Sequence, residues 1–451
     1  MYFCSTRYTA MLNFLYKKTD NAPLVVFRIL LGLLMIYHCV GHILDGVVYR
    51  LYIKPKVTFS FIGMEWLQPL SGNGMYIYFG VMAAFAVCFT IGFWYRLSTA
   101  MFTILWAGSY FMQKTVYNNH HYLILLLFII MLMLPANTYA SVDCKLNPKI
   151  KQRSMPVWYI WVFILQIAIV YFFASVAKFY PDWLNGRFTG FIIMKMRYPW
   201  ITWLTYSHKF HLFIAWGGIL FDMLIVPALL YKKTRNIAAI FCVGFHLFNW
   251  ATLSIGIFPF LSISYLVFFY PPDKIRTLLL RNKPPLTEHE LNATDTGSKN
   301  LLNYFFIPYF IIQFALPLRH HFIKGDVLWT EEGHRLSWRM MLKLKKGTTI
   351  FAVKDITNNQ SFVYDLNKLL TKRQITNING KPDMIWQTAQ LIKKEYAKKG
   401  HDVAVYVTTK VSVNRRTSKL LIDPKTDLAH TKWNYFTHNE WILLYDDSTK
   451  N

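Results

Sequence analysis

Long apolar stretches alternate with short polar segments through the first 317 residues of the chain. Nine of these stretches are candidate membrane spans, at residues 24–48, 75–93, 97–111, 121–134, 157–176, 212–230, 237–253, 257–270 and 301–317. A helix of about 20 apolar residues crosses a bilayer, and since several of the nine are shorter, tilted, broken or re-entrant helices are expected among them. The pattern predicts a mainly α-helical polytopic membrane domain of about eight to nine helices over residues 1–317.

A different pattern begins at residue 318 and continues to the end of the chain. Apolar and polar residues alternate, as they do in β-strands, in "TTIFAVKD" (348–355), "QSFVYDL" (360–366) and "DVAVYVTTKVSV" (402–413). Residues 381–399 have apolar positions at helical spacing. We therefore expect an α+β extramembrane domain over residues 318–451, joined to the membrane domain through a polar linker at residues 282–300.

The composition agrees with a membrane protein, because 54% of the residues are hydrophobic and only 16% are charged. The first apolar stretch follows Lys17 and Lys18 and is expected to be a signal anchor, not a cleaved signal. Lysine and arginine are more frequent in the segments that share a side with the N-terminus. This bias predicts a cytoplasmic N-terminus and an extracytoplasmic C-terminal domain, lumenal in a eukaryote. The net charge of +26 then indicates contact with anionic lipid, not with nucleic acid.

Haem or metal binding has weak support in the sequence. The five cysteines are scattered, without the spacing of a zinc site or a disulfide framework. His38 and His42 are four residues apart and share a helix face, which suits haem or metal ligation but also occurs for simple hydrogen-bonding groups. No set of carboxylates or cysteines accompanies them, so we expect no metal.

Polar side chains are concentrated in "KTVYNNHHYL" (114–123), where the chain re-enters the membrane between two expected spans. Asparagine is favoured at helix N-caps, so Asn118 or Asn119 can serve as a cap. Capping alone does not account for His120 and His121, which follow the asparagines directly. The cluster is therefore a candidate functional site as well as a candidate cap.

Lys178 ends an apolar stretch in "SVAKFYPDWLNGR" (175–187). A lysine in this position usually extends toward the lipid headgroups, and position alone favours that interpretation. The aromatic residues that follow, and Asp182 with Trp183, indicate a pocket instead. A lysine held in an apolar pocket loses its proton more easily and can act as a general base.

Further polar residues fall inside the later apolar stretches. His246 and Asn249 in "FHLFNWATLSIGIFPF" (245–260) are three residues apart, so they share a helix face. Polar groups within a membrane are costly unless paired, which makes both candidates for function, although a histidine paired with a neighbour is an equally good interpretation. Gly256 and Pro259 are expected to break the helix. Asp222 is a candidate partner for one of these residues or for a basic residue.

Five segments, in order along nearly the whole chain, resemble the vitamin K-dependent gamma-glutamyl carboxylases and their bacterial-type relatives with a carboxylase-like (HTTM) membrane domain. They are "NNHHYL" (118–123), "QIAIVYFFASVAKFYPDWLNG" (166–186), "FHLFNWATLSIGIFPF" (245–260), "LSWRMM" (336–341) and "VSVNRRTSKLLIDPKTD" (411–427). The resemblance implies a membrane lyase that couples oxygenation of a reduced naphthoquinone to its epoxide with carboxylation of peptide glutamate.

The resemblance also implies roles for individual residues. Lys178 has the position of the base that deprotonates reduced vitamin K, which oxygen then converts to the epoxide through a strongly basic intermediate. That intermediate removes a proton from the γ carbon of a glutamate side chain, and carbon dioxide adds to the carbanion. His120 has the position of the family's histidine in this later step, and Asn119 of a residue that orients the quinone oxygens. Further quinol-binding positions are Asn118, Trp183, His246, Asn249, Met340 and Met341.

The implied cofactor is reduced vitamin K, either phylloquinol or menaquinol, with O2 and CO2 as co-substrates. The implied partners are membrane lipid and a peptide or protein that contains glutamate. A water-poor site suits this chemistry, because a carbanion and a strong oxyanion base both react with water. Three other functions stay open: quinol epoxidation without carboxylation, haem-linked quinol oxidation, and a non-enzymatic transporter or assembly factor on the same membrane fold.

The sequence departs from the animal enzymes at several positions. These differences weaken the expected carboxylation of a peptide more than the expected oxygenation of a quinol. Ala177 stands where those enzymes carry a second lysine, and Tyr117 replaces a tryptophan. Lys343 and Lys345 follow the "RMM" segment where the animal enzymes have histidine and arginine. Positive charge is retained there, but the hydrogen-bonding geometry of the side chains changes.

Overall fold

The computed structural model describes residues 14–194, 202–253, 255–295, 297–340 and 342–445. The long helices of the membrane domain are α2 (Ala22–Leu44), α3 (Gly74–Ile91), α4 (Tyr95–Met112), α5 (Asn119–Met133), α7 (Trp158–Val176), α11 (His208–Leu230), α12 (Arg235–Leu253) and α17 (Ile307–Leu318). Shorter helices are η1 (Tyr49–Ile53), η2 (Lys114–Val116), α6 (Val142–Leu146), η3 (Pro148–Ile150), α8 (Pro181–Leu184), α9 (Arg187–Ile193), α10 (Thr202–Thr205), α13 (Phe258–Ser264), η5 (Tyr265–Phe268), α14 (Pro272–Leu279), α15 (Glu288–Asn292), α16 (Lys299–Leu301) and η6 (Leu302–Phe306).

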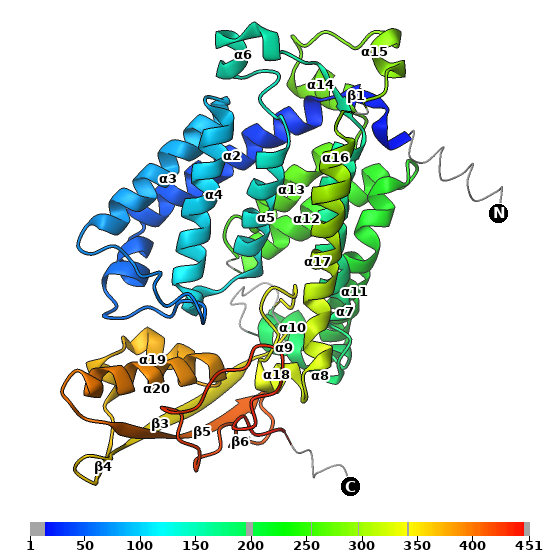
Figure 1. The fold of residues 1–451 in the computed structure, drawn as a ribbon. Coiled ribbons are helices and arrows are strands. Elements are labelled where there is room, and N and C mark those ends of the chain that lie inside the picture. The colour runs from blue at the N-terminus through cyan, green and yellow to red at the C-terminus, as the bar shows by residue number, and fades with distance from the viewer. Residues whose placement is uncertain (1–13, 195–201, 254, 296, 341, 446–451) are drawn as a thin grey trace, which may run out of the picture.

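The C-terminal part contains η7 (Arg319–Phe322), α18 (Val327–Thr330), η8 (Leu366–Lys368), α19 (Lys372–Ile378) and α20 (Pro382–Ala397), with strands β3 (Lys345–Asp355), β4 (Gln360–Val363), β5 (Val403–Val413) and β6 (Lys419–Leu420). Two short strands, β1 (Lys18–Asp20) and β2 (Ser154–Pro156), pair at the opposite end of the helical bundle. Figure 1 shows the sheet, α19 and α20 at one end of the bundle, and α6, α14 and α15 at the other end.

Each of the nine predicted spans contains a helix, but the count of eight to nine crossings is not confirmed. Within the described ranges, five helices are long and apolar enough to cross a bilayer: Ala22–Leu44, Gly74–Ile91, Trp158–Val176, His208–Leu230 and Lys299–Phe322. The others fall short for a physical reason. α5, for example, has 15 residues and is about 22 Å long, against about 30 Å of hydrocarbon.

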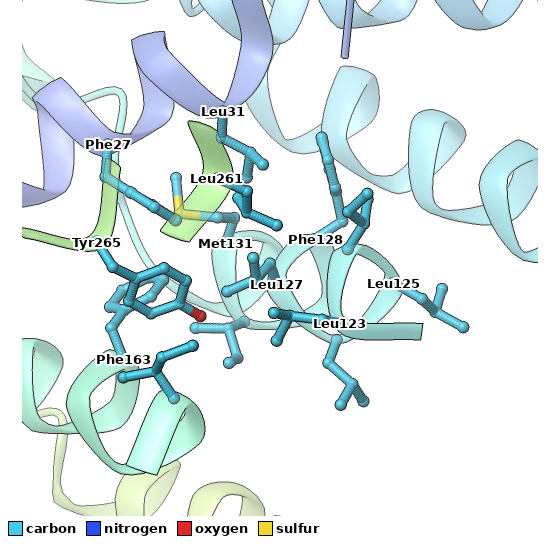
Figure 2. Packing of buried hydrophobic residues seen from close by; sticks show 14 of the residues in the cluster. Phe27, Leu31, Leu123, Leu125, Leu127, Phe128, Met131, Phe163, Leu261 and Tyr265 are labelled. Atoms are coloured by element: carbon cyan, nitrogen blue, oxygen red, sulfur yellow. The ribbon is translucent and has the colours of Figure 1, made fainter. Parts of the chain in front are cut away.

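α5 lies in the centre of the bundle, where other helices surround it. Leu127 and Met131 of α5 belong to one buried cluster with Phe27 of α2, Phe163 of α7 and Leu261 of α13 (Figure 2). A helix that is apolar on all sides is typical of a fully buried position. The short central helix therefore positions its polar N-terminal residues from inside the protein, without needing to span the bilayer itself.

Close packing of α2 against α3 depends on Gly32. A Cβ atom on Gly32 would lie 2.0 Å from Oγ1 of Thr90, so only glycine permits this approach. Arg28, one turn before Gly32, is buried and donates hydrogen bonds to the carbonyl oxygens of Thr90 (3.3 Å), Ala136 (2.7 Å) and Ala140 (2.6 Å). These oxygens lie at and beyond helix C-termini, where backbone acceptors lack partners within the helix.

The C-terminal part has the α+β architecture expected from its pattern. Its sheet has the strand order β4-β3-β5-β6, and all pairs are antiparallel. Lys345 pairs with Val413 and Asp355 with Val403 along the central β3–β5 pair. Alternate residues of β5 are buried together with the apolar side of α20, which covers one face of the sheet. The three predicted strands and the predicted helix are confirmed.

The C-terminal part is docked on the loop that precedes α3. Gln374 donates a hydrogen bond to the carbonyl oxygen of Val57 at 2.7 Å, and Gln387 donates one to Ser60 at 3.0 Å. Between them, Phe59 is buried in the apolar core of the C-terminal part. The membrane bundle therefore holds this part through a buried loop as well as through the chain connection.

The segment 282–300 is not the simple polar linker that the sequence predicts. It contains α15, which begins with a capping box formed by Thr287 and Glu290. Glu290 also forms an ion pair with Arg153 at 2.8 Å. Lys283 is buried and pairs with Asp20. Polar composition here reflects ion pairs with the end of the bundle that carries β1 and β2, which fix the segment in place.

Candidate active site

Lys178 lies just beyond the end of α7 and points into the protein. Its ammonium group forms an ion pair with the carboxylate of Asp222 on α11, and the two side chains are 12% and 8% exposed. The Lys178 ammonium also lies 5.4 Å from the ring centroid of Trp183. The expectation that Lys178 extends toward the lipid headgroups is therefore wrong, because a carboxylate on the neighbouring helix holds it. Asp222 has the basic partner that the sequence suggested.

The surroundings of Lys178 are built by α7, α8 and α11 together. The indole nitrogen of Trp183 donates a hydrogen bond to the carbonyl oxygen of Ala215 at 2.9 Å, which fixes the ring against α11. The ring passes close to Gly218 of α11, where a Cβ atom would lie 3.7 Å from it, an ordinary contact distance. Asp182 of α8 accepts a hydrogen bond from Asn414 at 2.8 Å, so the C-terminal part braces the same helix.

The Asn-Asn-His-His segment combines a capping role with contacts to the C-terminal part. The side chain of Asn118 accepts a hydrogen bond from the backbone N–H of His120 at 2.8 Å, which confirms the predicted N-cap. Asn119 accepts a hydrogen bond from the hydroxyl of Tyr117 at 2.7 Å and donates one to the carbonyl oxygen of Arg339 at 3.0 Å. Asn119 therefore connects the start of α5 to the segment that contains "RMM".

His120 and His246 both contact the ring of Phe258. His120 stacks on Phe258 with ring centroids 3.7 Å apart and an interplanar angle of 13°. His246 lies edge-on to Phe258 at 5.7 Å, and its Nε2 forms a hydrogen bond of 2.7 Å with the hydroxyl of Tyr171. Gly256 has a positive φ of 67° and Pro259 lies in the first turn of α13, so the predicted helix break is confirmed. This break places Phe258 at the start of α13, where its ring contacts both histidines.

Four buried polar atoms in the interior of the membrane domain, two of them on the histidines that contact Phe258, have no hydrogen-bond partner among the described residues. They are Nδ1 of His120, Nδ1 of His246, Nε2 of Gln166 and the hydroxyl of Tyr265. The buried polar atoms of folded proteins are nearly all paired, so a group of orphaned atoms in one region needs an explanation. Donors and acceptors left open in an apolar interior are what a flat ligand with hydroxyl or carbonyl groups requires.

The remaining predicted residues are more dispersed. Asn249 is half-buried, and its side chain forms no hydrogen bond within the part of the chain that the structure describes. It differs in this from His246, which is buried and bonded to Tyr171. Met340 packs against the main apolar cluster of the membrane domain. Met341 lies outside the described residues. Of the predicted set, the structure therefore groups Lys178 with Trp183, and His120 with His246.

A largely buried cluster of charged residues lies in the C-terminal part, just after the "RMM" segment. Glu331 forms ion pairs with Lys343 at 3.0 Å and Lys345 at 3.7 Å. Burial lowers the pKa of Lys345 to about 7, even though Glu331 acts in the opposite direction. Burial alone would raise the pKa of Glu331, but Lys343 and Lys345 hold it below its ordinary value. Lysines therefore keep a positive centre at the positions where the sequence departs from the animal enzymes.

Sequence reasoning missed Gln166, Tyr171, Phe258 and Tyr265. Aromatic residues in apolar stretches are normal core residues, so the sequence has no signal that separates these three from their neighbours. Gln166 offers a weak signal, as a lone amide within an otherwise apolar helix. The hydroxyl of Tyr309 donates to its side-chain oxygen, which leaves only the amide nitrogen open.

The described residues include no group of three or more His, Cys, Asp or Glu side chains arranged to hold a metal ion. His38 and His42, the pair considered for haem or metal, stack on each other with ring centroids 3.8 Å apart. Cys39, Cys88, Cys144 and Cys242 are free thiols.

Two family models match the chain, one after the other. The HTTM domain matches residues 16–274, which is more than half of the chain, and the lumenal domain of vitamin K-dependent gamma-carboxylase matches residues 298–448. No solved structure gives a significant match. With its apolar helices, the chain is a multi-pass membrane protein. It belongs to the vitamin K-dependent gamma-carboxylase family, with an HTTM membrane domain followed by the lumenal domain of that family.

Proposed function

We propose that the protein oxidises a reduced naphthoquinone with molecular oxygen and couples this reaction to the carboxylation of glutamate side chains in a peptide. One observation carries the proposal: a buried lysine–aspartate pair and a group of unpartnered polar atoms occur together in the interior of a carboxylase-family membrane domain. The proposed orientation has the N-terminus in the cytoplasm and the C-terminal domain outside it.

The residues around Phe258 fit a bound quinol. Phe258 and the ring of His120 supply flat apolar surface for a naphthalene ring. The open atoms of His120, His246 and Gln166 supply partners for its two hydroxyl groups. When bound, a reduced naphthoquinone supplies the reducing power and the strong base that carboxylation of an unactivated carbon requires. The apolar walls exclude water, which would consume such a base.

In this proposal Lys178 and Asp222 hold and transfer the first proton. Transfer of the ammonium proton to the Asp222 carboxylate leaves a neutral amine, which can then accept a proton from a hydroxyl group of the quinol. The products are an ammonium ion, a protonated carboxyl group and a quinol anion. Positive and negative charge remain paired in the apolar surroundings, so no isolated buried charge is created.

His120 is the proposed group for the later proton transfers. Its Nδ1 has no partner among the described residues, and its ring is held by stacking on Phe258 and by the cap of α5. A neutral imidazole with one open nitrogen can accept or return a proton without a change of position. Tyr171 holds the other histidine, His246, through Nε2, so the two imidazoles are not equivalent.

The cluster of charged residues around Glu331 supports binding of the glutamate side chain. Lys343 and Lys345 exceed their single carboxylate partner, Glu331, and Arg339 adjoins Asn119 in the same region. A peptide carboxylate that reaches this surface meets excess positive charge at low solvent exposure, where an ion pair is stronger than in water. This part of the proposal concerns the glutamate of a peptide or protein whose identity the charge pattern does not specify.

The test is an assay of the purified full chain in lipid nanodiscs with phylloquinol or menaquinol, oxygen, labelled carbon dioxide and a glutamyl peptide. We expect both quinone epoxide and label in the peptide. Epoxide without incorporated label would reject the coupled reaction and identify a quinol epoxidase. Formation of neither product with either quinol would reject the proposed enzyme and favour a transporter or assembly factor. A haem absorption band in the purified protein would favour haem-linked quinol oxidation.

A further inference from the structure

We infer that a cavity lined by His38, His42 and His121 holds water and conducts protons between the candidate active site and the solvent next to the C-terminal domain. This inference rests on the proposed function, since carboxylation of a glutamate by carbon dioxide replaces a C–H bond with a carboxylate and releases one proton, which must leave the membrane interior. It assigns a role to three histidines that the proposed reaction does not otherwise use.

The three imidazoles form a row. The cavity has a volume of about 100 Å³ and is lined by residues of α2, η1, α3, α4, η2 and α5. The ring centroids of His38 and His42 are 3.8 Å apart, and those of His38 and His121 are 5.4 Å apart. Trp106 lies edge-on to His38 at 5.1 Å and to His121 at 5.4 Å, which keeps both rings upright in the cavity. A single water molecule can bridge nitrogen atoms at such spacings.

Two of the three rings lack the hydrogen bonds that structural histidines usually make, while the ring of His42 interacts with the backbone of His38. In the described part of the chain, the rings of His38 and His121 have aromatic neighbours but no hydrogen-bond partner. The hydroxyl of Tyr110, in the same wall, also lacks a partner. His38 is 8% exposed and Tyr110 is 6% exposed. Buried polar atoms need partners, and a polar cavity of this size has room for the water molecules that would supply them.

The walls of the cavity carry no fixed charge. Besides the three histidines, the titratable residues that face it are Tyr52 and Tyr110, and no lysine, arginine, aspartate or glutamate is among its lining residues. An ion pair would trap a proton at one position, whereas a row of neutral imidazoles joined by water passes it on. Chains of histidines and carboxylates within membranes commonly serve as proton relays.

The row has a connection at each end. At the outer end, Asp45 lies at the exposed end of α2 and acts electrostatically on His42. At the inner end, His121 directly follows His120 in α5, and the two rings interact electrostatically. Each imidazole accepts a proton at one nitrogen and releases the proton on the other. The one net proton of each coupled turnover thereby reaches bulk water at Asp45, and no electrons are transferred along the row.

The first test measures water access without any need for turnover. Deuterium exchange at the C2 carbon of each histidine, followed by mass spectrometry of the full chain in nanodiscs, reports contact of each ring with solvent. We expect His38 and His121 to exchange within about tenfold of exposed His208, and His246 to exchange far more slowly. Protection of His38 and His121 equal to that of His246 would overturn the inference, whether or not the protein is an enzyme.

The second test uses chemical rescue. His38→Ala is expected to slow steady-state epoxide formation about tenfold to a hundredfold, and added imidazole to restore it to within about twofold. Pyrrole has the same size but no basic nitrogen, so rescue by pyrrole would show a packing role and overturn the inference, as would an unchanged rate. His208→Ala is the matched control. Absence of epoxide in the unaltered protein would instead refute the proposed function, and the exchange test would still decide the water-filled row.

Discussion

Two buried charges, Lys178 and Asp222, stabilise each other at the junction of α7 and α11. Removal of one member of a buried ion pair typically costs about 3–5 kcal/mol, because the other charge is left without compensation. A loss of activity after substitution of Lys178 can therefore arise from lost chemistry or from lost folding. Experiments at this site need a variant that separates the two.

We predict that Lys178→Ala lowers quinol turnover about a hundredfold or more and also lowers Tm, since Asp222 is left unpaired. The double variant Lys178→Ala/Asp222→Ala is expected to recover most of the lost Tm without recovering turnover. Epoxide formation and thermal unfolding in the same nanodisc preparation measure the two effects, with exposed Lys209→Ala as the control. Retained turnover in the single variant would contradict the role of Lys178 as the base.

Lys345 makes stability depend on pH. Burial lowers its pKa from 10.5 in the unfolded chain to about 7 in the folded protein, so between these values the unfolded state binds more protons. The free energy of unfolding is therefore expected to rise as the pH increases from about 7 toward 10. Below pH 7 both states are protonated, so this group adds no pH dependence there. Lys345→Met should flatten the rise in Tm over this range. The exposed neighbour Lys346→Met should leave it unchanged, and an equal flattening in both variants would refute the assignment.

At the scale of elements, glycine and asparagine determine how the helices meet. Gly32 lets α2 approach α3 until Thr90 fills the space of a side chain, and Asn118 begins α5 with a side-chain cap. The sequence shows where these helices lie, because apolar runs define them. It does not show that α5 is enclosed by other helices or that Phe258 contacts both His120 and His246. Those contacts join separate helices, and a hydrophobic pattern along the chain does not specify which helices become neighbours.

We predict that Gly32→Ala destabilises the membrane domain by about 1–3 kcal/mol, the usual cost of excess volume in a packed core. Gly80→Ala in α3 is the matched control, because a Cβ atom there has no neighbour within 4 Å. Thermal unfolding of the two variants should show a loss of Tm for Gly32→Ala only. An equal change in both would indicate that helix propensity, and not close packing, decides the effect.

At the scale of the whole molecule, one carboxylate joins the two domains. Asp383 of α20 forms ion pairs with Lys114, in the loop before α5, at 2.7 Å and with Arg335 at 2.9 Å. Burial would raise its pKa, but these two cations hold the pKa of Asp383 below its ordinary value. The sequence indicates both domains from their patterns. It does not indicate this junction, since three charges in separate segments look like ordinary surface residues until the fold buries them.

We predict that Asp383→Asn costs about 3–5 kcal/mol, because Lys114 and Arg335 lose their shared counter-charge. Backbone deuterium exchange should increase at residues 54–68 and 334–340, where the C-terminal domain docks. Asp402→Asn, at a side chain that is 59% exposed, is the control. Unchanged exchange at both segments would show that apolar contacts around Phe59 are sufficient to hold the domain.

The chain just before β3 is attached to both halves of the candidate site. Asn119, which precedes His120, donates a hydrogen bond to the carbonyl oxygen of Arg339. Tyr180, two residues after Lys178, donates one from its hydroxyl to the carbonyl oxygen of Leu342. Arg339 and Leu342 therefore tie the chain before the β-sheet to the imidazole side and to the amine side of the site. Under the proposed function, a peptide bound to the C-terminal part would contact both sides of the candidate site through this one segment, which links the arrival of a glutamate to the formation of the base that it consumes.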